Sequence, residues 1–103
     1  MAQFQKVASV SEIPAGTGKK VEVGGKKIAV INVGGSFAAI QECCPHRGGP
    51  LSEGLMQGCH VVCPWHAWTY DVTTGDRVGF PPGMGRIRTY SVRVEGDDIC
   101  LEC

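Results

Sequence analysis

The run CCPHRGGPLSEG at residues 43–54 is followed by the run CPWHAWTYD at residues 63–71. One residue separates Cys44 from His46 in the first run, and two residues separate Cys63 from His66 in the second. Thiolate sulfur is a soft ligand that binds iron or zinc, and imidazole nitrogen binds both metals. Two tight pairs of such side chains predict a transition-metal site whose ligands are Cys44, His46, Cys63 and His66.

The make-up of the two pairs bears on whether the site holds one zinc ion or two irons. Structural zinc sites usually take two cysteines from one short segment and two histidines from another. Each pair here is mixed, and Pro45 restrains the backbone between Cys44 and His46. Each pair could therefore direct its cysteine to one metal atom and its histidine to a second atom a few ångströms away. The spacing favours two irons, while a structural zinc and four ordinary packing side chains remain the alternatives.

The residues around these four positions closely resemble the two cluster-binding motifs of Rieske [2Fe-2S] proteins. The resemblance is carried by residues 44–54 and by residues 63–71 with Thr74-Gly75, and the flanking strand pattern extends it over nearly the whole chain. It implies one [2Fe-2S] cluster in which the two cysteines bind the inner iron and the two histidines bind the outer iron. Such a ligand set raises the reduction potential above that of all-cysteine plant-type clusters.

Two positions inside the motifs distinguish branches of this family. Rieske proteins of respiratory and photosynthetic membrane complexes carry an additional cysteine in each motif, joined as a disulfide, and Gly49 and Trp65 occupy those positions here. Trp68 replaces a hydroxyl donor to the cluster, whereas Tyr70 matches a second one. Fewer hydrogen bonds leave the added electron less stabilised, so the resemblance implies a potential toward the low end of the Rieske range of about −150 to +300 mV.

Glycine and proline residues near the ligands have expected roles of their own. Gly48, Gly49 and Gly54 lack side chains, which would let backbone N–H groups approach the cluster sulfurs. Phe80-Pro81-Pro82-Gly83 resembles the proline-bearing loop that covers the cluster from a third side in this family. A rigid linker between two strands is the alternative interpretation of that segment.

Short strands between glycine turns predict the rest of the fold. Two Gly-Gly turns, at 24–25 and 34–35, separate apolar runs at 21–23, 26–33 and 37–41, which predicts two β-hairpins. Alternation over 90–95, a Gly96-Asp97 turn and a closing strand at 98–102 predict a third. One helical turn is expected at 11–14. We expect an all-β fold, an antiparallel Rieske-like β-sandwich with a small inserted cluster-binding subdomain.

Length and composition predict one small module. The 103 residues suit a single domain, with a cluster-binding part at about 42–82 and a basal β part formed by the remainder. Ten basic and ten acidic residues give no overall field that would attract nucleic acid or an anionic membrane. No export signal or membrane-spanning run is present in the sequence, so we expect a cytoplasmic protein. In that setting the remaining cysteines, Cys43, Cys59, Cys100 and Cys103, do not predict a disulfide scaffold.

A cluster without an open coordination position, on a chain without a nucleotide-binding loop, can accept and donate single electrons and do little chemistry by itself. We therefore expect an electron-transfer protein rather than an enzyme. The chain most closely resembles the ferredoxin components of bacterial ring-hydroxylating dioxygenase systems. That resemblance implies a monomer that transiently binds an NAD(P)H-dependent flavoprotein reductase and a terminal (di)oxygenase, with neither nucleic acid nor membrane as a partner.

Two other functions stay open. The small Rieske-like subunit of an assimilatory nitrite reductase would be a structural partner of a larger enzyme, but such subunits often lack some cluster ligands, and this chain keeps all four. A zinc-stabilised binding module is the other alternative. Metal analysis would separate it from both iron-sulfur hypotheses.

Overall fold

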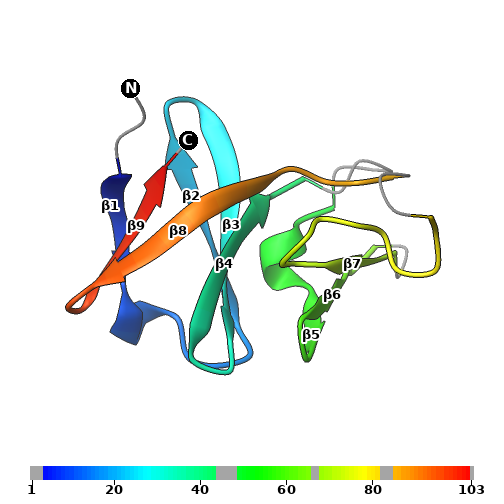
Figure 1. The fold of residues 1–103 in the computed structure, drawn as a ribbon, viewed down its shortest axis with the longest axis horizontal. Helices are drawn as coiled ribbons and strands as arrows, with labels where there is room; N and C mark the ends of the chain where they lie inside the picture. The colour runs from blue at the N-terminus through cyan, green and yellow to red at the C-terminus, as the bar shows by residue number, and fades with distance from the viewer. Residues whose placement is uncertain (1–3, 44–48, 66–67, 82–84, 103) are drawn as a thin grey trace.

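The computed structural model describes residues 4–43, 49–65, 68–81 and 85–102, and strands make up nearly all the regular secondary structure of this part of the chain (Figure 1). The elements in chain order are β1 (Phe4–Ser9), η1 (Val10–Glu12), β2 (Gly18–Val23), β3 (Lys26–Val33), β4 (Ser36–Gln41), η2 (Leu51–Glu53), β5 (Leu55–Gln57), β6 (His60–Val62), β7 (Thr69–Asp71), β8 (Thr89–Glu95) and β9 (Asp98–Glu102), where η marks a single 3-10 turn. All the strand pairs are antiparallel, which confirms the predicted fold class. Within the described ranges, no helix has the length and apolar character needed to cross a membrane.

The three predicted hairpins are present at the predicted turns. In the β2–β3 turn, Gly24 and Gly25 have φ values of 57° and 80°, a left-handed conformation that glycine adopts without a steric penalty. Strands β2, β4 and β8 begin up to three residues earlier than predicted, because their first residues pair in the ladder although they add nothing to the apolar pattern. The expected helical turn is η1, one residue earlier than predicted at its start.

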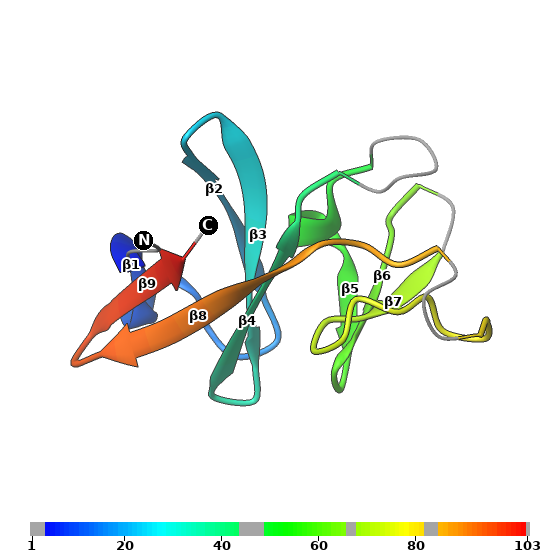
Figure 2. The same cartoon turned by 45° about the horizontal axis from the view of Figure 1, so that its top comes forward.

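A six-stranded sheet in the order β1-β9-β8-β4-β3-β2 forms the base of the molecule. Strand β8 joins its two halves, since Thr89 and Tyr90 pair with β4 while the residues from Ser91 onward pair with β9 (Figures 1 and 2). One apolar core lies between the two halves and consists of Ala8, Ile13, Val21, Val23, Ile28, Val30, Ala39, Ile99 and Leu101.

Strand β3 is buried on both of its faces, because successive side chains of a strand point to opposite sides. Ile28 and Val30 enter the core between the two halves, whereas Ala29 and Ile31 enter a second core. The second core joins the base sheet to a small sheet of order β5-β6-β7 and consists of Ala29, Ile31, Ile40, Leu51, Val61, Cys63, Tyr70, Val72 and Ile87. Figure 2 shows the small sheet beside the base sheet. One predicted metal ligand, Cys63, is thus positioned by apolar packing.

The turn η1 is attached to the base sheet by an ion pair. The Ser9 backbone N–H donates to Glu12 Oε1 at 3.0 Å, and Lys19 of β2 donates to Glu12 Oε2. The hydrogen bond from Lys19, followed by the one from Ser9, lowers the pKa of Glu12 below its usual value. All three groups are exposed, so the pair makes a small contribution to stability.

Candidate metal centre

Cys63 is the predicted ligand that the structure describes. It directly follows β6, only 2% of its surface is exposed, and it belongs to the second apolar core. The other three predicted ligands, Cys44, His46 and His66, lie outside the described residues. The four-ligand set therefore stays a prediction. The described residues around these positions show whether the surroundings suit such a site.

The first motif forms a loop that is closed at its base. Cys43 and Pro50 form an isolated β-bridge, and the Leu51 N–H donates to the Glu42 carbonyl at 2.8 Å. The Glu42 side chain is 4% exposed, and its two carboxylate oxygens accept hydrogen bonds from the Ser52 N–H at 2.8 Å and the Ser52 hydroxyl at 2.7 Å. Glu42 thus anchors the end of the loop to the end of β4. Sequence reasoning missed this residue, since an acidic residue next to a strand is ordinarily exposed.

The second motif forms a loop that is closed in a similar way. The Cys63 N–H donates to the Trp68 carbonyl at 2.7 Å, and Val62 of β6 pairs with Thr69 of β7 directly below it. The tip between these residues contains Trp65, whose side chain is 57% exposed. The described residues at the two ends of each motif are therefore held together by backbone hydrogen bonds.

The two loops meet at Gly49. A Cβ atom at Gly49 would lie 2.8 Å from Cys63 Sγ and 3.2 Å from Trp65 Cγ, so the first motif approaches the second too closely for any side chain at this position. A cluster held by both motifs requires the loops to lie against each other at the ligand sulfur. The glycine backbone and the buried thiol of Cys63 satisfy this requirement, and the described residues fit a [2Fe-2S] cluster.

Gly54 has a different role from the one expected. Its N–H donates to the Leu51 carbonyl at 3.0 Å, so it is not available to a cluster sulfur. A Cβ atom here would lie 2.4 Å from the Val62 carbonyl oxygen. Gly54 therefore allows η2 to pack against β6, and the expected hydrogen bond to the cluster is wrong for this glycine. Gly48 lies outside the described residues.

A third segment runs alongside β7. Arg77 forms a bridge with Tyr70, and its guanidinium lies 3.5 Å from the centre of the Trp68 ring and 4.0 Å from that of Phe80. This stacking orients the chain that leads to Phe80 and Pro81, while Pro82 and Gly83 lie outside the described residues. The covering role of 80–83 therefore stays a prediction. Among the described residues of these loops, the large apolar side chains of Trp65, Val78 and Phe80 are exposed.

Asp71 at the end of β7 organises the turn that follows. Its Oδ1 accepts hydrogen bonds from the Thr73 N–H at 2.8 Å and the Thr73 hydroxyl at 2.5 Å, and its carbonyl accepts from the Gly75 N–H at 2.7 Å. Burial raises the pKa of the Asp71 carboxyl, but the hydrogen bonds from Thr73 and Thr74 outweigh it, and the net pKa is lowered. The turn thereby returns the chain toward Arg77.

The remaining cysteines differ in exposure. Cys43 is exposed, Cys59 is half-buried in the turn between β5 and β6, and Cys100 of β9 is 8% exposed. Its burial gives Cys100 a packing role in β9. Cys103 lies outside the described residues.

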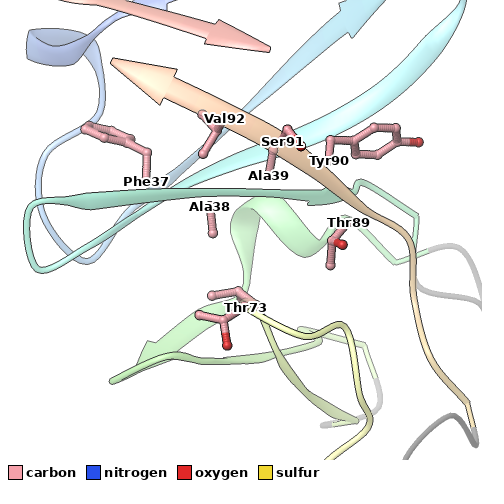
Figure 3. Close-up of a pocket in the computed structure, with 9 residues that line it drawn as sticks. Phe37, Ala38, Ala39, Thr73, Thr89, Tyr90, Ser91 and Val92 are labelled. Atoms are coloured by element: carbon pink, nitrogen blue, oxygen red, sulfur yellow. The ribbon is translucent and has the colours of Figure 1, made fainter. Parts of the chain in front are cut away.

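A pocket of about 410 Å³ lies between β4, β8 and the turn after β7 (Figure 3). The hydroxyl-bearing residues Thr73, Thr89, Tyr90 and Ser91 line it together with apolar residues such as Phe37. Cysteine, histidine and carboxylate side chains are absent from this lining among the described residues. Among the described residues, the lining therefore contains none of the side chains that usually bind iron or zinc, and it does not include Cys63.

The family model of the Rieske [2Fe-2S] domain matches residues 3–91. The biphenyl dioxygenase ferredoxin subunit of Pseudomonas sp. (strain KKS102) is 37% identical over 100 residues, which cover 96% of this chain and 91% of that protein. Apoptosis-inducing factor 3 of Mus musculus is 32% identical over 95 residues, which cover 92% of this chain and 16% of that protein. This chain thus spans about one sixth of the length of the second relative.

Solved structures share the fold along almost the whole chain. The ferredoxin of carbazole 1,9a-dioxygenase from Nocardioides aromaticivorans IC177 has a TM-score of 0.86 at 28% identity, covering 96% of both chains. A complex of reduced oxygenase and oxidised ferredoxin in carbazole 1,9a-dioxygenase gives 0.84 at 30% identity, covering 96% of this chain and 92% of that one. A putative nitrite reductase small subunit gives 0.83 at 17% identity, covering 96% and 97%, a likeness that shows the fold alone.

These similarities confirm the predicted Rieske-like fold and the predicted cofactor, one [2Fe-2S] cluster. They also confirm the resemblance to dioxygenase ferredoxins that the two motifs indicated. The chain belongs to the Rieske [2Fe-2S] domain family.

Proposed function

We propose that this chain is a one-electron carrier that passes electrons from an NAD(P)H-dependent flavoprotein reductase to the terminal oxygenase of a ring-hydroxylating system. The approach of Gly49 to Cys63 Sγ carries the site part of the proposal, because it brings the two motifs together around one sulfur. We infer that Cys44, His46, Cys63 and His66 bind the cluster. We also infer that residues 1–103 act as one domain, with the cluster-binding part at about 42–82.

The cofactor, when bound, would supply reversible one-electron chemistry. The chain itself would contribute position and shielding. Burial of Cys63 in the second core keeps water from one side of the site, and the closed bases of both loops fix the distance between the motifs. The aligned region covers 91% of the biphenyl dioxygenase ferredoxin subunit, so nearly all of that carrier corresponds to this domain, which supports an electron-carrying role. Cytoplasmic location and a monomeric state stay predictions.

Exposed apolar side chains on the two motif loops and the segment after β7 are the proposed contacts for both partners. They are Trp65, Val78 and Phe80, which are 57%, 41% and 43% exposed. Small contact areas suit transient electron-transfer encounters because such complexes dissociate rapidly. The solved complex of a carbazole dioxygenase oxygenase with its ferredoxin supports this kind of partner.

The test uses the iron-loaded protein with the reductase and oxygenase of a biphenyl dioxygenase system. We expect NADH to bleach the visible spectrum when reductase is present, and biphenyl hydroxylation to depend on this chain. Phe80→Ala should lower the hydroxylation rate while leaving iron content unchanged. Val94→Ala is the matched control, because Val94 is 44% exposed but lies on the β8–β9 hairpin, at the other end of the molecule from β5–β7 (Figure 1).

Two results would contradict the carrier function. The first is iron-loaded protein that the reductase does not reduce. The second is stable co-purification with the large subunit of a nitrite reductase without any support of hydroxylation, which would favour the alternative of a structural subunit.

A further inference from the structure

Three metal-binding side chains meet at the end of the small sheet away from the cluster loops. Cys59 lies in the turn between β5 and β6, His60 begins β6, and Asp71 ends β7. The Cys59 sulfur, a nitrogen of His60 and a carboxylate oxygen of Asp71 all lie within 4.8 Å of one another. All three residues are half-buried, so solvent can reach the group.

Strand pairing explains why the three side chains converge. His60 and Asp71 are direct partners in the β6–β7 ladder, so their side chains lie on the same face of the sheet. Cys59 is held beside them because the Val72 N–H donates to its carbonyl at 2.9 Å. The convergence therefore results from the backbone ladder and does not depend on chance rotamers of long side chains.

The carboxylate of Asp71 is already oriented toward the thiol. Its Oδ1 accepts both hydrogen bonds from Thr73, which leaves Oδ2 on the side of Cys59, with a distance of 4.0 Å between Oδ2 and Sγ. Ligands of bound metals are commonly fixed by such outer hydrogen bonds. Thr73 would therefore act as a positioning residue for Asp71.

The distances suit a small thiophilic ion. Tetrahedral zinc with its usual bond lengths places two neighbouring donors about 3.3–3.6 Å apart. The sulfur-to-oxygen distance of 4.0 Å exceeds that range by about half an ångström. The other two donor pairs, which lie within 4.8 Å, exceed it by at most about 1.5 Å, so binding would draw the three side chains together. A thiolate, an imidazole and a carboxylate provide three ligands, and water would complete the fourth position.

We propose that Cys59, His60 and Asp71 form a zinc-binding site that is distinct from the Rieske cluster. Binding would form a Zn–S bond as the Cys59 thiol releases its proton to solvent, with no change of oxidation state. His60 precedes Cys63 by three residues along an extended segment, which separates their Cα atoms by about 10 Å. This site does not depend on the electron-carrier function proposed above.

The test measures zinc and iron on the same sample. Protein verified to hold two irons per chain is dialysed against chelator-buffered micromolar free zinc, and both metals are counted by mass spectrometry. We expect one zinc per chain with no loss of iron in the wild type. Cys59→Ser and His60→Ala should each weaken zinc binding at least tenfold. Cys43→Ser is the matched control, since Cys43 is an exposed cysteine outside the group, and it should bind zinc as the wild type does.

Zinc X-ray absorption distinguishes this site from zinc that has entered the cluster ligands. The proposed site predicts one sulfur neighbour at about 2.3 Å and the remaining neighbours as nitrogen or oxygen at about 2.0 Å. Two sulfur neighbours per zinc, or zinc uptake matched by loss of iron, would overturn the proposal. Equal zinc uptake by wild type and Cys59→Ser, or no uptake by the wild type, would overturn it too.

Discussion

Gly49→Ala places a methyl group where the two motif loops meet. The new Cβ would lie 2.8 Å from Cys63 Sγ, whereas apolar heavy atoms normally approach to about 3.5–4.0 Å. The overlap of about 0.7–1.2 Å cannot be relieved by moving the sulfur into solvent, because Cys63 is only 2% exposed. Overpacking of this kind costs about 1–3 kcal/mol, and here the strain would act on a predicted iron ligand.

If all of that free energy acts on cluster binding, the equilibrium constant between cluster-bound and cluster-free protein changes about 5- to 150-fold toward the cluster-free form. The assay is iron per chain after purification, followed by the rate at which a chelator bleaches the visible absorption. We expect less than full iron content and faster bleaching for Gly49→Ala than for the wild type. Iron is expected to be lost because the methyl group would push apart the two loops that we propose hold the cluster.

Gly34→Ala is the control for the cost of adding a methyl group. Gly34 lies in the β3–β4 turn with a φ of 60°, and a Cβ there would meet nothing within 4 Å. This variant should lose about 1 kcal/mol of unfolding free energy from left-handed strain and keep the wild-type bleaching rate. The reasoning would be refuted if Gly49→Ala retained full iron and bleached no faster than Gly34→Ala.

Three further predictions concern the surroundings of the site. Glu42→Ala should lower the free energy of unfolding by about 1.5–3 kcal/mol in urea titrations, because it removes a buried hydrogen-bond acceptor, and Ser52→Ala should cost less because the backbone bond survives. Arg77→Lys keeps the charge but loses planar stacking on two rings, so hydrogen exchange should quicken in the segment that pairs with β7; unchanged exchange would contradict this role. Glu12→Gln should lower the melting temperature slightly at neutral pH. Because the folded-state pKa of Glu12 is lowered, that difference should vanish as the pH falls below it, and a difference that persists in acid would count against the ion pair with Lys19.

The long hairpins could be predicted from sequence because their signals are local. Gly-Gly turns between apolar runs specify β2–β3–β4, and clear alternation specifies β8. Strand β1 was missed because the register shifts between Lys6 and Ala8, which interrupts the alternating pattern. The three-residue strands β5, β6 and β7 are too short to show a period. The pairing of β4 with β8 joins residues about fifty positions apart and has no local signal.

Part of the site could also be predicted from the sequence, because some of its signals are local. The ligand types and their spacing are local, so the two motifs were recognisable in the chain. The contact of Gly49 with Cys63 and the anchoring of the first loop by Glu42 depend on how distant segments pack. The convergence of Cys59 and His60 with Asp71 likewise needs the β6–β7 register, because these residues are eleven or more positions apart in sequence.

The central claim is that this chain binds a two-iron cluster through the two motifs. The most direct measurement is the count of iron and acid-labile sulfide per chain in freshly purified protein, made beside a Cys63→Ser variant. We expect two irons and two sulfides per chain in the wild type and a loss of both in the variant. One zinc per chain without sulfide in the wild type, or an unchanged iron and sulfide count in Cys63→Ser, would contradict it.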